Sequence, residues 1–390
     1  MKLLSLPTLL LLSQWVSASD PINAQEPILE VESSRALLKL HKALVDIGSI
    51  TGNEQEVGKY LVSYLENQNF TVEIQDVDAI ASAKGPRRNI FAFKGNQRKT
   101  RTLVTSHIDV VPPYWPYKRE GDEIWGRGSV DAKGCVATQI TAFEELYTAG
   151  EIEEGDVALL FVVGEEGPGD GMKKANDLDL KWDTVIFGEP TELKLASGHK
   201  GIISVEIKAK GKAGHSGYPQ LGKSANAMLI PALYALQNVE LPWSEKYGNT
   251  TLNIGRIEGG VAANVIAEDA KASIAIRIAD GPPEAVKKIV LDVIQKGGEV
   301  LDVSFSQGYG PVFINSNVEG KSQSIVLTVL FADGSQGFET IVVNYGTDIP
   351  NLQGDHKRYL YGPGTFTHTR SASSFIDKVY RLHFGCSLGP

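Results

Sequence analysis

The strongest constraint on the fold is the order in which helical and strand-like patterns follow each other along the chain. Helical periodicity over 33–47 and 54–66 alternates with apolar, strand-like runs at 88–93, 102–111, 156–163 and 184–187. Buried strands that alternate with amphipathic helices indicate a layered α/β domain.

The order changes in the middle of the chain. A strand is predicted at 202–210, a helix at 224–236, strands at 251–257 and 270–278, a helix at 283–296 and a strand at 301–306. This βαββαβ order is typical of a compact split βαβ sandwich. Strand-like runs return at 324–330 and 339–344. We therefore expect an α/β domain of residues 32–198 and 308–390 with a smaller ferredoxin-like domain, 199–307, inserted into it.

The first residues have the pattern of a secretory signal peptide. Lys2 precedes an apolar run over 3–12, and the small residues Ser17 and Ala18 follow it. We predict cleavage of residues 1–18 and a secreted, extracellular protein. The run is too short to cross a bilayer, so no membrane anchor is expected. The sequons at Asn69 and Asn249 are compatible with a secreted glycoprotein.

Composition excludes several classes of function. The net charge is −9 and charged residues make up 22% of the chain, without a long basic block. Broad binding of nucleic acid or of an anionic membrane is therefore not expected. Cys135 and Cys386 are the only cysteines, which rules out a four-thiolate metal site and leaves open whether they pair.

Chemically active side chains stand where the apolar strands end. His107 and Asp109 are two residues apart, so His107 can bind a metal while Asp109 accepts its other ring N–H. A strand end with two solvated polar groups is the alternative. Asp131 follows a glycine-rich turn and precedes a helix, where it either caps the helix or bridges metal ions.

Two further strands end in carboxylates. Glu165 and Glu166 follow one apolar run, and Glu189 follows another. Of two adjacent carboxylates, one can bind a cation while the other faces a metal-bound water as general base. Because the carboxyl ends of parallel strands form the ligand sites of α/β sheets, we expect these groups to converge. An acidic turn in solvent is the alternative.

These motifs together resemble the di-zinc hydrolases of metallopeptidase family twenty. That family includes acetylornithine deacetylase, succinyl-diaminopimelate desuccinylase, aminoacylase and the glutamate carboxypeptidase that acts on folates. The resemblance rests on SHIDVVP, GRGSVDAKG, GEEG, GEPTE and GHSGYPQLGKSAN, in that order, and runs from about Ser33 to about His368. It implies a zinc-binding catalytic domain with an inserted lid or dimerisation domain.

The resemblance implies two Zn²⁺ per chain and a role for each matching residue. Asp131 would bridge the two ions, with His107 and Glu189 completing one site. Glu166 and a late histidine would complete the other. That histidine is assigned to His368, with His356 as the fallback, because the C-terminus departs from the family pattern. Glu165 would be the general base and Asp109 would support His107.

The inserted domain would supply groups that bind the substrate. His215 matches the family histidine that stabilises the oxyanion and, in a homodimer formed through this domain, reaches the partner's site. Asn264 would bind near the reacting centre, and Arg277 would bind a free carboxylate. An exposed loop histidine and a surface arginine are the alternatives.

We therefore predict a secreted zinc-dependent hydrolase, a carboxypeptidase acting on peptides or an N-acyl-amino-acid deacylase. An inactive binding protein of the same fold is the alternative from another class. Residues 217–224 also satisfy the P-loop pattern of an NTPase. Pro219 counts against that reading, since it lacks an N–H where amides should bind phosphate.

Overall fold

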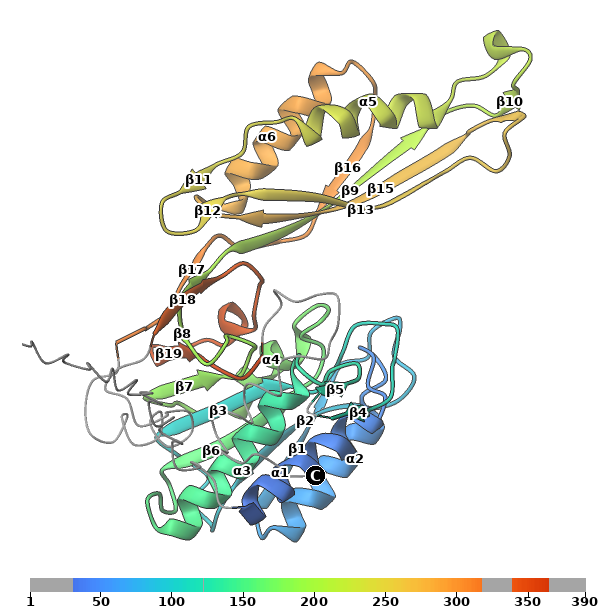
Figure 1. The fold of residues 1–390 in the computed structure, drawn as a ribbon. Helices are drawn as coiled ribbons and strands as arrows, with labels where there is room; N and C mark the ends of the chain where they lie inside the picture. Colours follow the sequence, from blue (N-terminus) through green and yellow to red (C-terminus); the bar gives the residue numbers. More distant parts are fainter. Residues whose placement is uncertain (1–30, 122, 318–338, 365–390) are drawn as a thin grey trace, which may run out of the picture.

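The structure is a computed structural model that describes residues 31–121, 123–317 and 339–364. These residues form a larger α/β part and a smaller, elongated part that stands above it (Figure 1). Among the described residues, no helix is both long and apolar enough to cross a membrane. Residues 1–18, the predicted strand at 324–330, His368 and Cys386 lie outside the described ranges.

The larger part is built on a mixed six-stranded sheet with the order β1-β2-β6-β3-β7-β19. Its strands are β1 (Thr71–Val77), β2 (Arg87–Phe93), β3 (Thr102–His107), β6 (Val157–Val162), β7 (Thr184–Phe187) and β19 (Lys357–Leu360). β3 is parallel to β6 and to β7, and β19 is parallel to β7. The carboxyl ends of these four strands therefore lie along one edge.

Three helices cover one face of this sheet (Figure 1): α1 (Val31–Asp46), α2 (Gln55–Asn67) and α3 (Lys133–Ala149). Leu40, Leu61 and Ile140 of these helices are buried in one cluster with Ile90 and Phe161 of the sheet. β6 is apolar throughout, with every residue buried, because both faces of its sheet are covered.

The opposite face packs against α4 (Asp170–Ala175) and a second sheet of order β17-β8-β18. The strands of this sheet are β8 (Leu195–His199), β17 (Val312–Phe313) and β18 (Thr340–Val343). A separate hairpin pairs β4 (Lys118–Glu120) with β5 (Glu123–Trp125). Short 3₁₀ turns lie at Asn176–Leu178, Pro219–Leu221 and Ile349–Asn351.

The smaller part is a four-stranded antiparallel sheet, β13-β15-β9-β16, with two helices on one face (Figure 1). Its elements are β9 (Gly201–Lys210), α5 (Ala225–Gln237), β13 (Thr251–Gly259), β15 (Asp269–Ile278), α6 (Pro283–Lys296) and β16 (Asp302–Phe305). Alternate residues of β9 and β15 are buried under the helices. This period of two is expected for a sheet with a single covered face.

A hairpin of the smaller part is bonded to the larger part. It pairs β11 (Trp243–Ser244) with β12 (Gly248–Asn249). Lys246 Nζ donates to the carbonyl of Ser197 at 2.7 Å, and the hydroxyl of Tyr247 donates to Val312 O at 3.1 Å. In the other direction, Lys200 Nζ donates to Asn249 O at 2.7 Å. Backbone acceptors on both sides therefore tie the two parts together.

The predicted α/β class with a βαββαβ insertion is confirmed, but individual elements differ. The run predicted as a strand over 102–111 ends at His107, since Val110 turns away to bond Ser49 O. Sequence periodicity missed β1, an edge strand that alternates too weakly to be recognised. It also missed β8, which is short and contains Gly198.

Candidate metal centre

His107 is the last residue of β3 and the centre of the site. Its Nδ1 donates to the backbone carbonyl of Asp109 at 3.0 Å, with Asp109 Oδ1 at 3.5 Å. This bond leaves Nε2 free to face the other side chains. His107 is 1% exposed, so the ring cannot exchange these partners for water. The imidazole is therefore held in one orientation.

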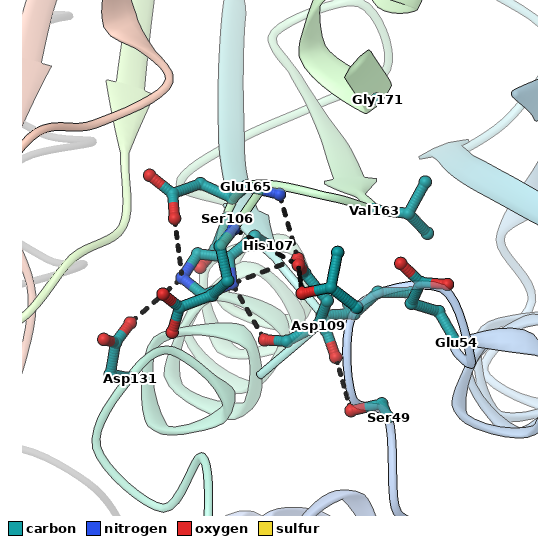
Figure 2. Close-up of polar contacts among 12 residues, drawn as sticks. Ser49, Glu54, Ser106, His107, Asp109, Asp131, Val163, Glu165 and Gly171 are labelled. Carbon is teal, nitrogen blue, oxygen red and sulfur yellow. Dashed lines mark hydrogen bonds and ion pairs between the residues drawn. The ribbon is translucent and has the colours of Figure 1, made fainter. Parts of the chain in front are cut away.

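Three carboxylates surround Nε2 of His107, and Figure 2 shows two of them, those of Asp131 and Glu165. The nearest oxygens are Asp131 Oδ1 at 3.0 Å, Glu189 Oε1 at 3.6 Å and Glu165 Oε2 at 4.0 Å. The sheet brings them together because His107 pairs with Val162 of β6, and Thr105 pairs with Phe187 of β7. Glu165 and Glu189 each follow their strand by two or three residues.

Asp131 comes from the loop before α3, and a buried lysine fixes that loop. Lys133 Nζ donates to the carbonyls of Leu44 at 2.8 Å and Ile47 at 2.7 Å, near the end of α1. The last carbonyls of a helix lack the full set of intrahelical bonds, so the ammonium adds a donor there, although Leu44 O also accepts the N–H of Ile47 at 3.3 Å. Burial lowers the pKa of Lys133 to about 7.

Asp109 is fully buried, and its carboxylate has further partners besides His107. Its Oδ1 accepts from the backbone N–H of Glu165 at 3.1 Å, and its Oδ2 accepts from the N–H of Glu166 at 3.2 Å. The hydroxyl of Thr51 donates to Oδ2 at 2.7 Å. One carboxylate therefore links the histidine of β3 to the acidic turn after β6.

The electrostatics of the cluster are those of anions held close together. Burial, with repulsion from neighbouring carboxylates, raises the pKa of Glu165 and of Glu189 well above the usual range. Burial and the charge of Asp131 raise the pKa of Glu166 to about 7. Although burial lowers the pKa of His107, Glu189 and the hydrogen-bonded aspartates outweigh it and leave that pKa raised.

This arrangement fits divalent metal ions. His107, Glu165 and Glu189 each offer a ligand atom within 4.8 Å of the others, and so do His107, Asp131 and Glu166. Nitrogen and oxygen donors without thiolates suit zinc. Carboxylates that repel one another in a dry site are stabilised when a cation is placed between them. His107 would hold an ion with Glu189, and Asp131 lies close enough to Glu166 to share another.

Arg277 lies at the junction of the two parts, one residue before the end of β15. A Cβ added to Gly346 would lie 3.5 Å from Arg277 Nη1 and would overlap the hydroxyl of Tyr309. Burial and the nearby charge of Glu165 raise the pKa of that hydroxyl. Tyr309 therefore lies between Arg277 and Glu165, and Arg277 is on the side of the junction that is nearer to the acidic cluster.

His215 and Asn264 lie elsewhere in this chain. His215 is in β10 (Gly214–His215), which pairs with β14 (Val265–Ile266), and the N–H of Ser216 donates to Asn264 O at 3.0 Å. Both residues are exposed, at the end of the smaller part that points away from the sheet of the larger part (Figure 1). The structure thus groups them with each other, and not with His107.

The last predicted zinc ligand, His368, lies outside the described residues. The fallback, His356, precedes β19, whose Lys357 pairs with Thr184 at the start of β7. Glu189 follows the end of β7, so His356 lies at the opposite edge of the sheet. His356 is buried there, and burial lowers its pKa to about 4. It does not join the cluster.

Asp348 is a candidate that sequence analysis missed. It is 5% exposed, its Oδ1 accepts from Asn351 Nδ2 at 2.8 Å, and its Oδ2 has no partner among the described residues. Burial raises its pKa to about 6. It lines a small cavity with His107 and Glu189. The sequence offers one weak signal for Asp348, a carboxylate that follows the strand-like run predicted at 339–344.

The neighbouring Thr347 links this segment to β8. Its hydroxyl donates to His199 Nε2 at 3.0 Å, because His199 Nδ1 donates to Lys200 O at 2.8 Å and leaves Nε2 as an acceptor. Burial, helped by the charge of Arg277, lowers the pKa of His199 to about 4. His199 is therefore neutral and structural.

Comparison with known proteins agrees with this architecture. The profile of the peptidase dimerisation domain matches residues 197–299. A peptidase M20 domain-containing protein of Schizosaccharomyces pombe is 43% identical over 87% of this chain and 80% of its own. A probable carboxypeptidase of Neosartorya fischeri is 42% identical over 88% of this chain and 82% of its own.

Solved structures share the fold at lower identity. A tripeptidase from Staphylococcus aureus has a TM-score of 0.70 and 23% identity, over 90% of this chain and 95% of its own. An M20 family metallo-carboxypeptidase from Sulfolobus solfataricus has a TM-score of 0.64 and 19% identity, over 91% and 97%.

A layered α/β domain with carboxylates around a buried histidine, and a dimerisation domain inserted into it, defines a two-domain metal-dependent hydrolase. At more than 40% identity over most of both chains, the protein belongs to the M20 peptidase family. It is a metallo-hydrolase of the peptidase class.

Metal binding should weaken as the pH falls from 8 to 6. The raised pKa values, about 7 for Glu166, mean that the metal-free site carries protons in this range, which a cation must displace. Each proton released lowers the affinity about tenfold per pH unit below the pKa. Competition with a chromophoric chelator would measure this, and a pH-independent affinity would contradict it.

Glu144→Gln is a matched control for this titration. Burial also raises the pKa of Glu144 to about 7, but this residue lies in the later part of α3, next to Lys94. We expect its replacement to leave the pH dependence of metal binding unchanged.

Proposed function

We propose that this chain is a secreted zinc-dependent carboxypeptidase that releases C-terminal amino acids from peptides. The observation that carries the proposal is the convergence of His107, Asp131, Glu165, Glu166 and Glu189 at one edge of the sheet. Arg277 supports the preference for a free carboxylate, because its partly buried guanidinium lies at the junction above this cluster.

In this proposal His107, Asp131, Glu166 and Glu189 hold two zinc ions, and His368 completes the ligand set. Bound zinc would supply Lewis acidity toward the scissile carbonyl and lower the pKa of the attacking water. Glu165 would take a proton from that water and deliver it to the departing amine nitrogen. Its raised pKa suits a group that must accept a proton and then release it.

The carboxylate of the substrate would be bound across the junction. The guanidinium of Arg277 has no hydrogen-bond partner among the described residues, and a planar guanidinium binds a carboxylate through two parallel hydrogen bonds. Peptides and N-acyl amino acids both present this group. Similarity to the probable carboxypeptidases favours the peptide.

We also propose that the working form is a homodimer in which His215 and Asn264 act on the partner's substrate. In one chain these residues point away from the cluster. The smaller part also exposes apolar side chains on the outer face of α5 and on the edge strand β13, namely Ile230 at 62%, Tyr234 at 70% and Ile257 at 61%. A second copy would bury them.

Secretion is part of the proposal and rests on the signal-peptide pattern. The side chains of Asn69 and Asn249 are both exposed, as an N-glycan requires. Asn69 follows α2 in a left-handed turn with φ +59°.

Glu165→Gln should lower kcat about 10²- to 10⁴-fold, because it removes the proton acceptor and keeps the shape of the side chain. Zinc per chain, measured by plasma mass spectrometry, should stay native. Glu166→Gln is the matched comparison and should instead reduce the zinc content. Near-native turnover of Glu165→Gln would refute the role of Glu165.

Arg277→Ala should raise KM about 10- to 100-fold for substrates with a free carboxylate and leave C-terminally amidated analogues nearly unchanged. Arg256→Ala is the control, because Arg256 is exposed on β13 and pairs with Glu258. The assay should include peptides and matched N-acyl amino acids. Equal losses on free and amidated substrates would exclude the role of Arg277.

Coexpression tests the shared site. Homodimers of Glu165→Gln and of His215→Ala should each be nearly inactive, since every site lacks one group. In a mixed population half of the dimers combine both variants, and each of these has one intact site, so about a quarter of native activity should return. If no activity returns although mixed dimers form, His215 does not act across the interface.

A further inference from the structure

The turn between β6 and α4 carries both Glu165 and Glu166, and its conformation decides where their side chains point. The tip of this turn is held by Asp109, whose two carboxylate oxygens accept the N–H groups of Glu165 and Glu166 (Figure 2). Asp109 contacts only the tip, so other groups must hold the two ends.

Asn89 of β2 joins the two ends. Its Oδ1 accepts from the N–H of Val163 at 3.3 Å, and its Nδ2 donates to the carbonyl of Gly171 at 2.7 Å. The N–H of Gly171 also donates to Val163 O at 3.1 Å. Asn89 is fully buried, and a Cβ on Gly171 would overlap Val163 O. The base of the turn therefore has a single close-packed arrangement.

Arg87 lies two residues before Asn89 on β2 and binds the segment directly after the turn. Its side chain is 0% exposed and binds two carboxylates, with Nη2 at 3.2 Å from Glu54 Oε1 and at 3.0 Å from Asp170 Oδ1. Asp170 is the first residue of α4, directly beyond the turn. Gly164 has φ +78°, and a Cβ there would overlap both Asp170 Oδ1 and Arg87 Nη2.

The guanidinium of Arg87 is itself held in place by a buried ion pair. Glu54 is also almost fully buried, so neither group of the pair can exchange its partner for water. Breaking a buried ion pair leaves an unpaired charge, which is strongly unfavourable. A shift of the turn away from Arg87 would break its pair with Asp170, whose side chain is 22% exposed, and leave the buried guanidinium with Glu54 and the carbonyl of Asp78.

We propose that Arg87 and Asn89 are positioning residues for the metal-binding and proton-transferring carboxylates of the turn. Asn89 acts through the backbone of Val163 and Gly171, Arg87 acts through the carboxylate of Asp170, and neither belongs to the metal centre. The inference rests on the proposed roles of Glu165 and Glu166. It predicts that β2, which contributes no side chain to the metal centre, sets both turnover and metal affinity.

Asn89→Asp is the sharpest variant, because it is isosteric and keeps an oxygen for Val163 N–H but loses the donor to Gly171 O and to Gln75 Oε1. We expect kcat to fall about 10- to 100-fold with KM changed less than about twofold. Zinc affinity, measured by chelator competition without substrate, should fall at least about tenfold, because Glu166 is displaced. Asn89→Ala should give a larger change in the same direction.

Arg87→Lys keeps the charge but loses the forked donors that reach Glu54 and Asp170 together, and it should give an intermediate effect. Arg88→Ala is the matched control. Arg88 follows Arg87 on the same strand, but its side chain is 44% exposed and, among the described residues, bonds Asp76 alone, at 2.9 Å. It should keep native kcat and zinc affinity.

A purely structural role would lower the folded fraction without changing kcat per folded molecule. Leu61→Ala, which removes a fully buried side chain of α2 on the helix-covered face, reports that effect. If Asn89→Asp and Arg87→Lys behave like Leu61→Ala, with native kcat and zinc affinity per folded chain, the inference is overturned.

A failure of the proposed function would be seen in a different measurement from a failure of this inference. If Glu165→Gln keeps native turnover, the catalytic role of Glu165 is wrong, but the zinc affinity of Asn89→Asp still reports on Glu166. Reduced zinc affinity would then support positioning of the turn, and native affinity would refute it.

Discussion

The site depends on one imidazole held among anions at the edge of a parallel sheet. His107 is fixed through Nδ1, and its Nε2 faces Asp131, Glu165 and Glu189 within 4.0 Å. Burial of these carboxylates, together with repulsion between them, raises the pKa of Glu165 and Glu189 well above the usual range. The surrounding structure serves to keep the charges in place, and cations would relieve the repulsion that this produces.

Buried polar side chains outside the cluster hold the segments that carry these charges. Asp109 binds the tip of the acidic turn, Asn89 closes its base, and Lys133 fastens the loop of Asp131 to the end of α1. Each bonds backbone N–H or carbonyl groups in the buried interior, which makes these contacts costly to break. The ligand geometry is thus a property of the domain and not of the ligands alone.

Much of the fold followed from periodicity, because β6 is continuously apolar and β9 alternates strictly. His107, Glu165, Glu166 and Glu189 followed from one rule, namely that polar residues after buried parallel strands meet at one edge, whereas Asp131 was assigned by the resemblance to the family. Asp348 follows β18, which belongs to the second sheet, so this rule does not place it at that edge. Periodicity missed β1 and β8, whose patterns are weak. The sequence also gave no indication that His356 lies at the edge of the sheet opposite the acidic cluster.

The sequence by itself determined the α/β class, the inserted βαββαβ unit and most residues of the acidic cluster, because these depend on local periodicity, on strand ends and, for Asp131, on a motif shared with the family. Only the tertiary structure decided that Arg277 faces the junction while His215 and Asn264 point away, and that Arg87 supports the turn of Glu165. These relations join residues far apart in the chain through strand order and domain orientation, which local patterns do not encode.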